Sequence, residues 1–215
     1  MSGRYPGYDV LAKRHSPSWN AQTRQVIDAR LAVSADAHRF FTETEWPTVL
    51  AVCERVIPQT DRSRSRVPIA ALIDGRLFEN RGDGYRDARL PPFRDAWRRA
   101  LLALDSESQR IHGARFHELS GLSQDDLLKR LQDGRSDEPA WGDVPPQLFF
   151  TKRLLHDIVT AYYSHPFAWS EIGFGGPAGP RGYVRMGLDR RDPWEAEEAR
   201  PGLDDGALRH NAGIR

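Results

Sequence analysis

Cysteine is nearly absent from this sequence, which contains one, Cys53, among 215 residues. A single cysteine cannot form an intrachain disulfide, and it cannot supply a four-cysteine zinc site or a Cys-x-x-Cys-His haem attachment. Because Cys53 lies among apolar residues that are spaced as on one face of a helix, we expect it to be a small buried hydrophobic residue and not a reactive thiol.

Long apolar runs are also missing. No window approaches the roughly 18 apolar residues of a membrane span. The N-terminal "MSGRYPGYDVLAKRHSPSWN" has neither the apolar stretch of a signal peptide nor paired arginines before one. We therefore expect no membrane span and, from this sequence by itself, a cytoplasmic location.

Charge of one sign is not in excess, since 31 basic side chains stand against 30 acidic ones and the signs are interspersed. Nucleic-acid-binding proteins usually present a basic face or stripe. The one dense basic cluster here, "RSRSR" at residues 62–66, is interpreted as a solvated loop in preference to a phosphate-binding site. We expect no nucleic-acid partner.

The histidines and glycines do not have the spacings of common catalytic motifs, since His-Glu-x-x-His, paired Glu-x-x-His and Gly-x-Ser-x-Gly are all missing. The adjacent His156 and Asp157 are interpreted as a capped or solvent-facing pair, with half of an acid/base site as the alternative. The glycines of "GFGGPAG" (173–179) follow a helical pattern, whereas a dinucleotide loop follows a strand. We predict no catalytic, cofactor-binding or metal-binding residue in this chain.

What the sequence does contain is helical periodicity between about residues 20 and 164. The clearest example is "TETEWPTVLAVCERVIP", in which Trp46, Val49, Cys53 and Val56 recur at three- and four-residue spacings. Similar patterns occur at residues 18–33, 67–80, 91–113, 123–134 and 147–165. Alternation with period two never persists for five positions, so no strand is expected. We predict an all-α protein, an irregular bundle of five to six helices.

Glycine, proline and aromatic residues gather in the stretch after the last of these patterns, "HPFAWSEIGFGGPAGPRGYVRM" (165–186). It is too rich in glycine for a helix and too aromatic for a free linker. Aromatic and methionine side chains are enriched in interface cores, and Trp, Tyr and Arg dominate binding hot spots. We predict an extended strap that contacts a partner protein through Phe167, Trp169, Phe174, Arg181, Tyr183, Arg185, Met186 and Trp194. The alternative is a strap that folds back, wholly or in its first half, over the chain's own helices.

These patterns divide the chain into three parts. We expect an irregular N-terminal arm over residues 1–18, a helical domain over 19–164, and an extended C-terminal strap and tail over 165–215. Residues 200–215 have almost no large apolar side chain, so we expect them to fray unless a partner orders them.

Several of these segments together resemble the gluconate 2-dehydrogenase subunit 3 family. The similarity includes "VLAVCERVIPQTD" (49–61), "IAALIDGRLFEN" (69–80), the Phe-x-x-Leu-Ser-x-x-x-Gln-x-x-Leu-Leu pattern of residues 116–128, and the aromatic "HPFAWSEIGFGGP" (165–177). It extends over roughly residues 40–195.

The resemblance implies a non-catalytic small (gamma) subunit that binds, stabilises and escorts a large FAD-dependent sugar or polyol dehydrogenase of the glucose–methanol–choline type. FAD is then expected in the partner, and some assemblies of the family add a multihaem cytochrome c. Family members often begin with a twin-arginine export signal, which this N-terminus does not match. The resemblance therefore leaves two locations open, a cytoplasmic complex or export to the periplasm on the signal of a partner.

Two other functions remain open from the sequence. One is a stand-alone helical scaffold or regulatory module that has no connection with redox chemistry. The other is a metal-dependent helical enzyme that would use His156, Asp157 and His165.

Overall fold

The computed structural model describes residues 4–60, 66–136, 139–177, 186–201 and 204–214. The chain forms two compact units. Unit 1 consists of residues 1–33, 65–67 and 162–215, and unit 2 of residues 34–64 and 68–161. This division differs from the predicted boundaries after residues 18 and 164, because the N-terminal and C-terminal segments pack on each other within unit 1.

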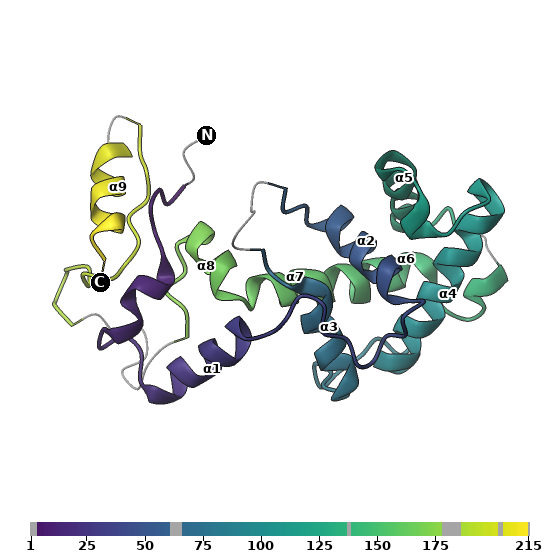
Figure 1. Ribbon diagram of the computed structural model, residues 1–215, viewed down its shortest axis with the longest axis horizontal. Helices are drawn as coiled ribbons and strands as arrows, with labels where there is room; N and C mark the ends of the chain where they lie inside the picture. The colour runs from purple at the N-terminus through teal and green to yellow at the C-terminus, as the bar shows by residue number, and fades with distance from the viewer. Residues whose placement is uncertain (1–3, 61–65, 137–138, 178–185, 202–203, 215) are drawn as a thin grey trace. The chain divides into compact units, whose positions relative to one another are not determined.

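The described residues form helices, turns and irregular segments without any strand, which confirms the predicted all-α class. Nine α-helices occur in these ranges, more than the five or six predicted. Their bounds, which can be followed by label in Figure 1, are α1 (Ala21–Leu31), α2 (Trp46–Val56), α3 (Ile69–Phe78), α4 (Phe93–His112), α5 (Gly121–Gln132), α6 (Pro146–Phe149), α7 (Leu155–Tyr163), α8 (Pro166–Ile172) and α9 (Asp204–Ala212). Short tight turns are η1 (Val10–His15), η2 (Phe116–Glu118) and η3 (Pro139–Trp141), and η4 (Phe150–Leu154) is a π-helical turn.

Unit 2 is built around α4, the longest helix. It begins after Pro92 and ends at Gly113, whose left-handed conformation (φ +72°) is typical of a helix C-terminus. Trp97, Ala100, Leu101 and Leu104 are all buried, as their spacing predicts. The N-cap of α5 is Ser120, whose hydroxyl accepts a bond from the Ser123 amide.

One buried carboxylate of unit 2 is fully engaged by backbone donors. The carboxylate of Asp74 on α3 is almost fully buried and accepts bonds of 2.7 to 2.9 Å from the backbone amides of Arg39, Phe40 and Phe41. Those amides precede α2 and would otherwise be costly to bury. Cys53 on α2 is buried, as predicted, and burial raises the pKa of its thiol to about 12.

Unit 1 has a core of three tryptophans. Trp19, Trp169 and Trp194 are buried together with Tyr8, Val10, Ile27 and Ile214. The indole of Trp169 donates to the carbonyl of Tyr163, and that of Trp19 donates to the carbonyl of Gly175. A buried indole N–H needs such a partner. The bond from Trp19 to Gly175 also holds the aromatic segment against the N-terminal residues.

The segment predicted as an extended strap begins with a helix, α8. Its N-cap is His165, whose Nδ1 accepts a bond from the Phe167 amide, and Pro166 occupies the first turn, where proline is tolerated. The expectation of no helix here was wrong, because the glycines lie beyond Ile172. Gly173 (φ +66°) and Gly176 (φ +78°) then bring the backbone against aromatic rings, where a Cβ would lie only 2.5 Å from Tyr5 and 3.0 Å from Trp169.

The C-terminal residues also form a helix, α9, where we had predicted fraying. Ala207 and Asn211 of this helix are buried in unit 1. The Asn211 side chain donates to the carbonyls of Pro6 and Glu197 and accepts from the Glu197 amide. A few small, well-bonded residues therefore order this segment without large apolar side chains.

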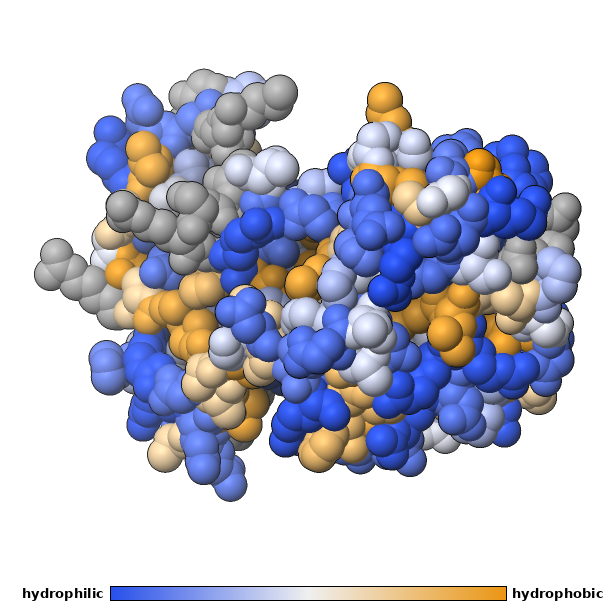
Figure 2. Space-filling model, turned by 45° about the vertical axis from the view of Figure 1, so that its right-hand side comes forward, coloured by the Kyte–Doolittle hydropathy of each residue, from blue (hydrophilic) through white to orange (hydrophobic). Residues whose placement is uncertain are grey.

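On the face shown in Figure 2, hydrophilic residues predominate and apolar residues form small separate groups between them. Within the described residues, no helix combines the length and apolar composition that crossing a bilayer requires.

Candidate functional site

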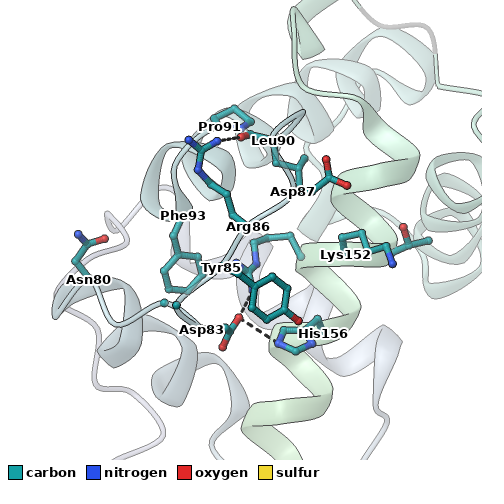
Figure 3. Close-up of a pocket in the computed structure, with 14 residues that line it drawn as sticks. Asn80, Asp83, Tyr85, Arg86, Asp87, Leu90, Pro91, Phe93, Lys152 and His156 are labelled. Carbon is teal, nitrogen blue, oxygen red and sulfur yellow. Dashed lines mark hydrogen bonds and ion pairs between the residues drawn. The ribbon is translucent and has the colours of Figure 1, made fainter.

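Unit 2 contains a pocket of about 720 Å³ between the loop that joins α3 to α4 and the helical segment around η4 (Figure 3). Its volume is within the range of roughly 300–1,000 Å³ that small-molecule sites usually have. Residues of both segments line it: Asn80, Gly82, Asp83, Gly84, Tyr85, Arg86, Asp87, Leu90, Pro91, Phe93, Thr151, Lys152, Arg153 and His156.

The α3–α4 loop has the left-handed residues that a sharp change of direction requires. Asn80 has φ +51° and Gly84 has φ +81°, and asparagine and glycine are the residues that tolerate this region best. Two bonds then stabilise the second half of the loop. The Arg86 guanidinium donates to the carbonyl of Leu90 (2.6 Å), and Asp87 accepts from the amide and side chain of Arg89.

The opposite wall of the pocket is the π-helical turn η4. A π-turn inserts an extra residue into a helix, and such insertions are frequent at functional sites. In this turn the consecutive residues Thr151, Lys152 and Arg153 all face the same pocket. On a regular α-helix three successive side chains spread over about 200°. The π-helical turn therefore places these three polar side chains together on the side that faces the α3–α4 loop.

Two residues of the pocket, Asp83 and Arg153, belong to a network of charges that is buried at Arg153 and Asp157 and more exposed at Asp83. Asp83 accepts from Arg76 (2.6 Å) and Arg153 (2.8 Å), and Arg153 also donates to Asp157 (2.9 Å). The Trp97 indole donates to the second oxygen of Asp157 (2.7 Å). This network ties the loop, α3, α4 and α7 together.

The two carboxylates respond differently to this environment. Burial raises the pKa of Asp157, and Arg153, Trp97 and Arg76 oppose that effect. Burial also acts to raise the pKa of Asp83, but the bonds from Arg153 and Arg76 outweigh it, so the pKa of Asp83 is lowered. Among the described residues, both carboxylates accept bonds from nitrogen donors, and both are paired with arginines.

Asp83, His156 and Asp157 bring three possible metal ligands within 4.8 Å of one another. His156 Nε2 lies 3.2 Å from Asp83 (Figure 3). The arrangement does not fit a cation, because the guanidinium groups of Arg76 and Arg153 and the Trp97 indole already bond to the carboxylate oxygens, and the two guanidinium groups would repel it. We interpret the cluster as an ion-pair network.

The favoured interpretation of His156 and Asp157 as a capped or solvent-facing pair is wrong for Asp157, whose side chain is only 1% exposed. His165, the third residue of the enzyme hypothesis, belongs to unit 1. It is buried there and caps α8, and burial lowers its pKa to about 4.

The predicted interface residues fall into three groups. Trp169 and Trp194 are buried in the core of unit 1, and Phe167 is half-buried with its ring 4.7 Å from that of His165. Phe174 and Met186 are exposed, by 37% and 58%. Arg181, Tyr183 and Arg185 lie outside the described residues. The two tryptophans thus follow the alternative in which the segment folds back on its own chain.

Of the residues that line the pocket, sequence reasoning singled out only His156. Asp83 and Gly84 lie after the predicted helix of residues 67–80, and Lys152 and Arg153 are in the middle of an apparently continuous helical pattern. The available signal was the density of charged residues in "NRGDGYRDAR" (80–89), which is high for a loop that only connects two helices.

Comparison with known families supplies one match. The family model described as gluconate 2-dehydrogenase subunit 3 matches residues 43–176, well over half of the chain. No curated protein and no solved structure matches this chain.

Proposed function

This chain belongs to the gluconate 2-dehydrogenase subunit 3 family, and we propose that it is a non-catalytic accessory subunit of a dehydrogenase complex. In this proposal it binds and stabilises a large flavin-dependent subunit that oxidises a sugar or polyol and holds the FAD. The observation that carries the proposal is the family match, which includes every α-helix of unit 2 together with α8.

The chemistry of the candidate site supports an accessory role. Asp83 and Asp157 are the acidic groups nearest to His156, and both are engaged by arginines. A general acid or base needs a proton that it can exchange with a substrate. Carboxylates that are engaged by guanidinium groups serve to position other residues.

The partner surface of the proposal lies on the C-terminal part of unit 1. Four apolar side chains on either side of residues 178–185 are exposed, namely Ile172 (45%), Phe174 (37%), Met186 (58%) and Leu188 (92%). Exposed apolar side chains that gather in one stretch of chain are typical of interaction sites. The Trp169 ring lies 5.6 Å from that of Phe174 and supports it. In this proposal Phe174, Arg181, Tyr183, Arg185 and Met186 contact the partner.

Isolation of the tagged chain from the cells that produce it tests the proposal. We expect a large flavoprotein to co-purify, with the yellow absorbance of flavin and with sugar- or polyol-oxidising activity that the chain alone lacks. A double variant, Met186→Glu/Leu188→Glu, should fold normally because both side chains are exposed, yet it should lose the flavoprotein. The matched control is Leu102→Glu/Leu122→Glu on unit 2, where the side chains are 66% and 85% exposed.

Each outcome bears on a different part of the proposal. Retention of the flavoprotein by the Met186/Leu188 variant would show that the partner binds elsewhere. Isolation of the wild-type chain without any flavoprotein, or dehydrogenase activity in the chain alone, would contradict the accessory role itself.

A further inference from the structure

The pocket of unit 2 has more positive than negative charge. Arg86, Lys152 and Arg153 line it, against the carboxylates of Asp83 and Asp87. Behind it Arg76 faces Asp157, and beside it Arg89 pairs with Asp87, so positive charge stays in excess. A concave site with an excess of one sign attracts the opposite charge. The expected ligand is an anion.

Lys152 is the cation best placed to meet that anion. Its side chain is exposed and forms no hydrogen bond with any described residue, and its one electrostatic neighbour there is Asp87. Asp87 in turn is paired with Arg89, and this pairing lowers the pKa of Asp87 to about 2. Lys152 is therefore available to a ligand.

Arg153 supplies a second feature that points to a ligand. Only 8% of its side chain is exposed, and its guanidinium lies 4.6 Å from the centre of the Phe93 ring. Its terminal nitrogen bonds to Asp83 and Asp157, but Nε has no partner among the described residues. A buried donor without a partner is rare and requires an explanation.

The rest of the lining suits a polyhydroxylated molecule better than a bare ion. Asn80, Asp83, Thr151 and His156 offer both donors and acceptors. Tyr85 is 78% exposed and presents a ring and a hydroxyl at the same loop. Small-molecule sites typically combine a few convergent polar groups with aromatic walls.

We propose that this pocket binds a small polyhydroxylated carboxylate, such as a sugar acid, with the carboxylate at Lys152 and the hydroxyl groups among the polar residues of the α3–α4 loop and η4. The site lies in unit 2, so the proposal is independent of the partner surface on unit 1. It also requires no flavoprotein.

Isothermal titration calorimetry on the full chain, at constant ionic strength and pH 7, tests the proposal with four probes. D-Gluconate carries both the carboxylate and the hydroxyl groups. Sorbitol has the hydroxyl groups without the charge, acetate has the charge without the hydroxyl groups, and inorganic phosphate is a bare polyanion. We expect saturable binding of one gluconate per chain and at least about tenfold weaker binding of the other three, since hydrogen bonds to charged groups contribute on this scale.

A lysine substitution provides a matched control. Lys152→Gln should weaken gluconate binding at least about tenfold, because it removes a charge-assisted contact. Lys129→Gln makes the same change of charge on α5 of the same unit, where Lys129 pairs with Asp133, and should leave binding unaltered. Both side chains are exposed, so both variants should fold.

Three results would overturn the proposal. They are the lack of saturable gluconate binding up to millimolar concentration, equal binding of acetate or phosphate, and equal loss of binding in the Lys152→Gln and Lys129→Gln variants. Because the chain is tested without a partner, none of them bears on the accessory role.

Discussion

Unit 1 and unit 2 bury their polar groups in different ways. In unit 2 ionised side chains meet in pairs and networks, as Asp157 does with Arg153 and Trp97. In unit 1 the buried polar side chains are mainly uncharged or cationic and bond to oxygens of the backbone or a hydroxyl. Asn211 bonds to the Pro6 carbonyl, Trp169 to that of Tyr163, and Lys13 to the Ser18 hydroxyl.

The difference follows from how each unit is assembled. Unit 2 is built from consecutive helices, whose side chains can meet in specific pairs across neighbouring elements. Unit 1 joins the two ends of the chain, and it relies on tryptophans and glycines to pack irregular backbone closely. The family match extends from residue 43 to residue 176 and therefore leaves out Tyr8, Trp19 and Trp194. The charged networks belong to the matched part, whereas much of the tryptophan core is outside it.

The largest expected effect is the removal of a charge from the network of unit 2. Asp157→Asn keeps the shape of the side chain but leaves Arg153 and Arg76 buried with less compensation. Breaking a buried pair in this way costs about 3–5 kcal/mol. We expect a loss of this size in the free energy of unfolding of unit 2, measured by denaturant titration with circular dichroism.

An exposed acid in the same unit is the control for that variant. Asp133→Asn removes ion pairs with Lys129 and Arg135 at the end of α5, where water already solvates the charges, and should change the stability little. Equal effects of the two substitutions would show that burial does not determine how much Asp157 contributes to the free energy of unfolding.

A smaller effect is expected in unit 1, and it depends on pH. Burial lowers the pKa of His165 to about 4, below the value of 6.5 in an unfolded chain. The neutral ring is therefore favoured by folding, so its contribution is complete above pH 6.5 and is lost as the pH falls through 4. The loss approaches about 3 kcal/mol at most. The measurement is a denaturant titration at several pH values, followed by tryptophan fluorescence.

His165→Asn separates this effect from the titration of carboxylates. Asparagine is a good N-cap and does not titrate, so the variant should keep α8 and lose stability less steeply between pH 6.5 and pH 4. Parallel curves for the variant and the wild type would mean that His165 is not responsible.

The smallest expected effects should be alike in the two units. Asn20 caps α1 of unit 1 by accepting from the Thr23 amide, and Ser120 caps α5 of unit 2 by accepting from the Ser123 amide. Replacement of either residue by alanine should cost about 1 kcal/mol. Thermal unfolding measures both. A much larger loss for one of them would show that its helix end is coupled to the surrounding core.

Much of the fold could be predicted from apolar periodicity. It located α2, α3, α4 and α5 to within a few residues, because in each helix one face is buried against the rest of unit 2. It could not locate α8, which is seven residues long, or α9, where an asparagine and an alanine supply the buried contacts. Short helices held by specific bonds leave little periodic signal.

The candidate site was less predictable because it depends on contacts between distant segments. Asp83 and Arg153 are 70 positions apart in the sequence, and their bond cannot be inferred from either segment alone. The π-turn η4 is equally hidden, since its residues continue a helical pattern. The predicted strap residues show the converse case. Trp169 has the aromatic side chain that is typical of an interface anchor. It is buried because residues from distant parts of unit 1 cover it, and the local sequence does not show this.

The single buried thiol on α2 has a practical consequence. Cys53 does not form the thiolate at neutral pH, so alkylating reagents should leave the folded protein unmodified. A cysteine introduced at an exposed position can thus carry a spectroscopic label without prior removal of the native one. In the wild-type chain, the rate at which Cys53 becomes alkylated measures how often unit 2 opens.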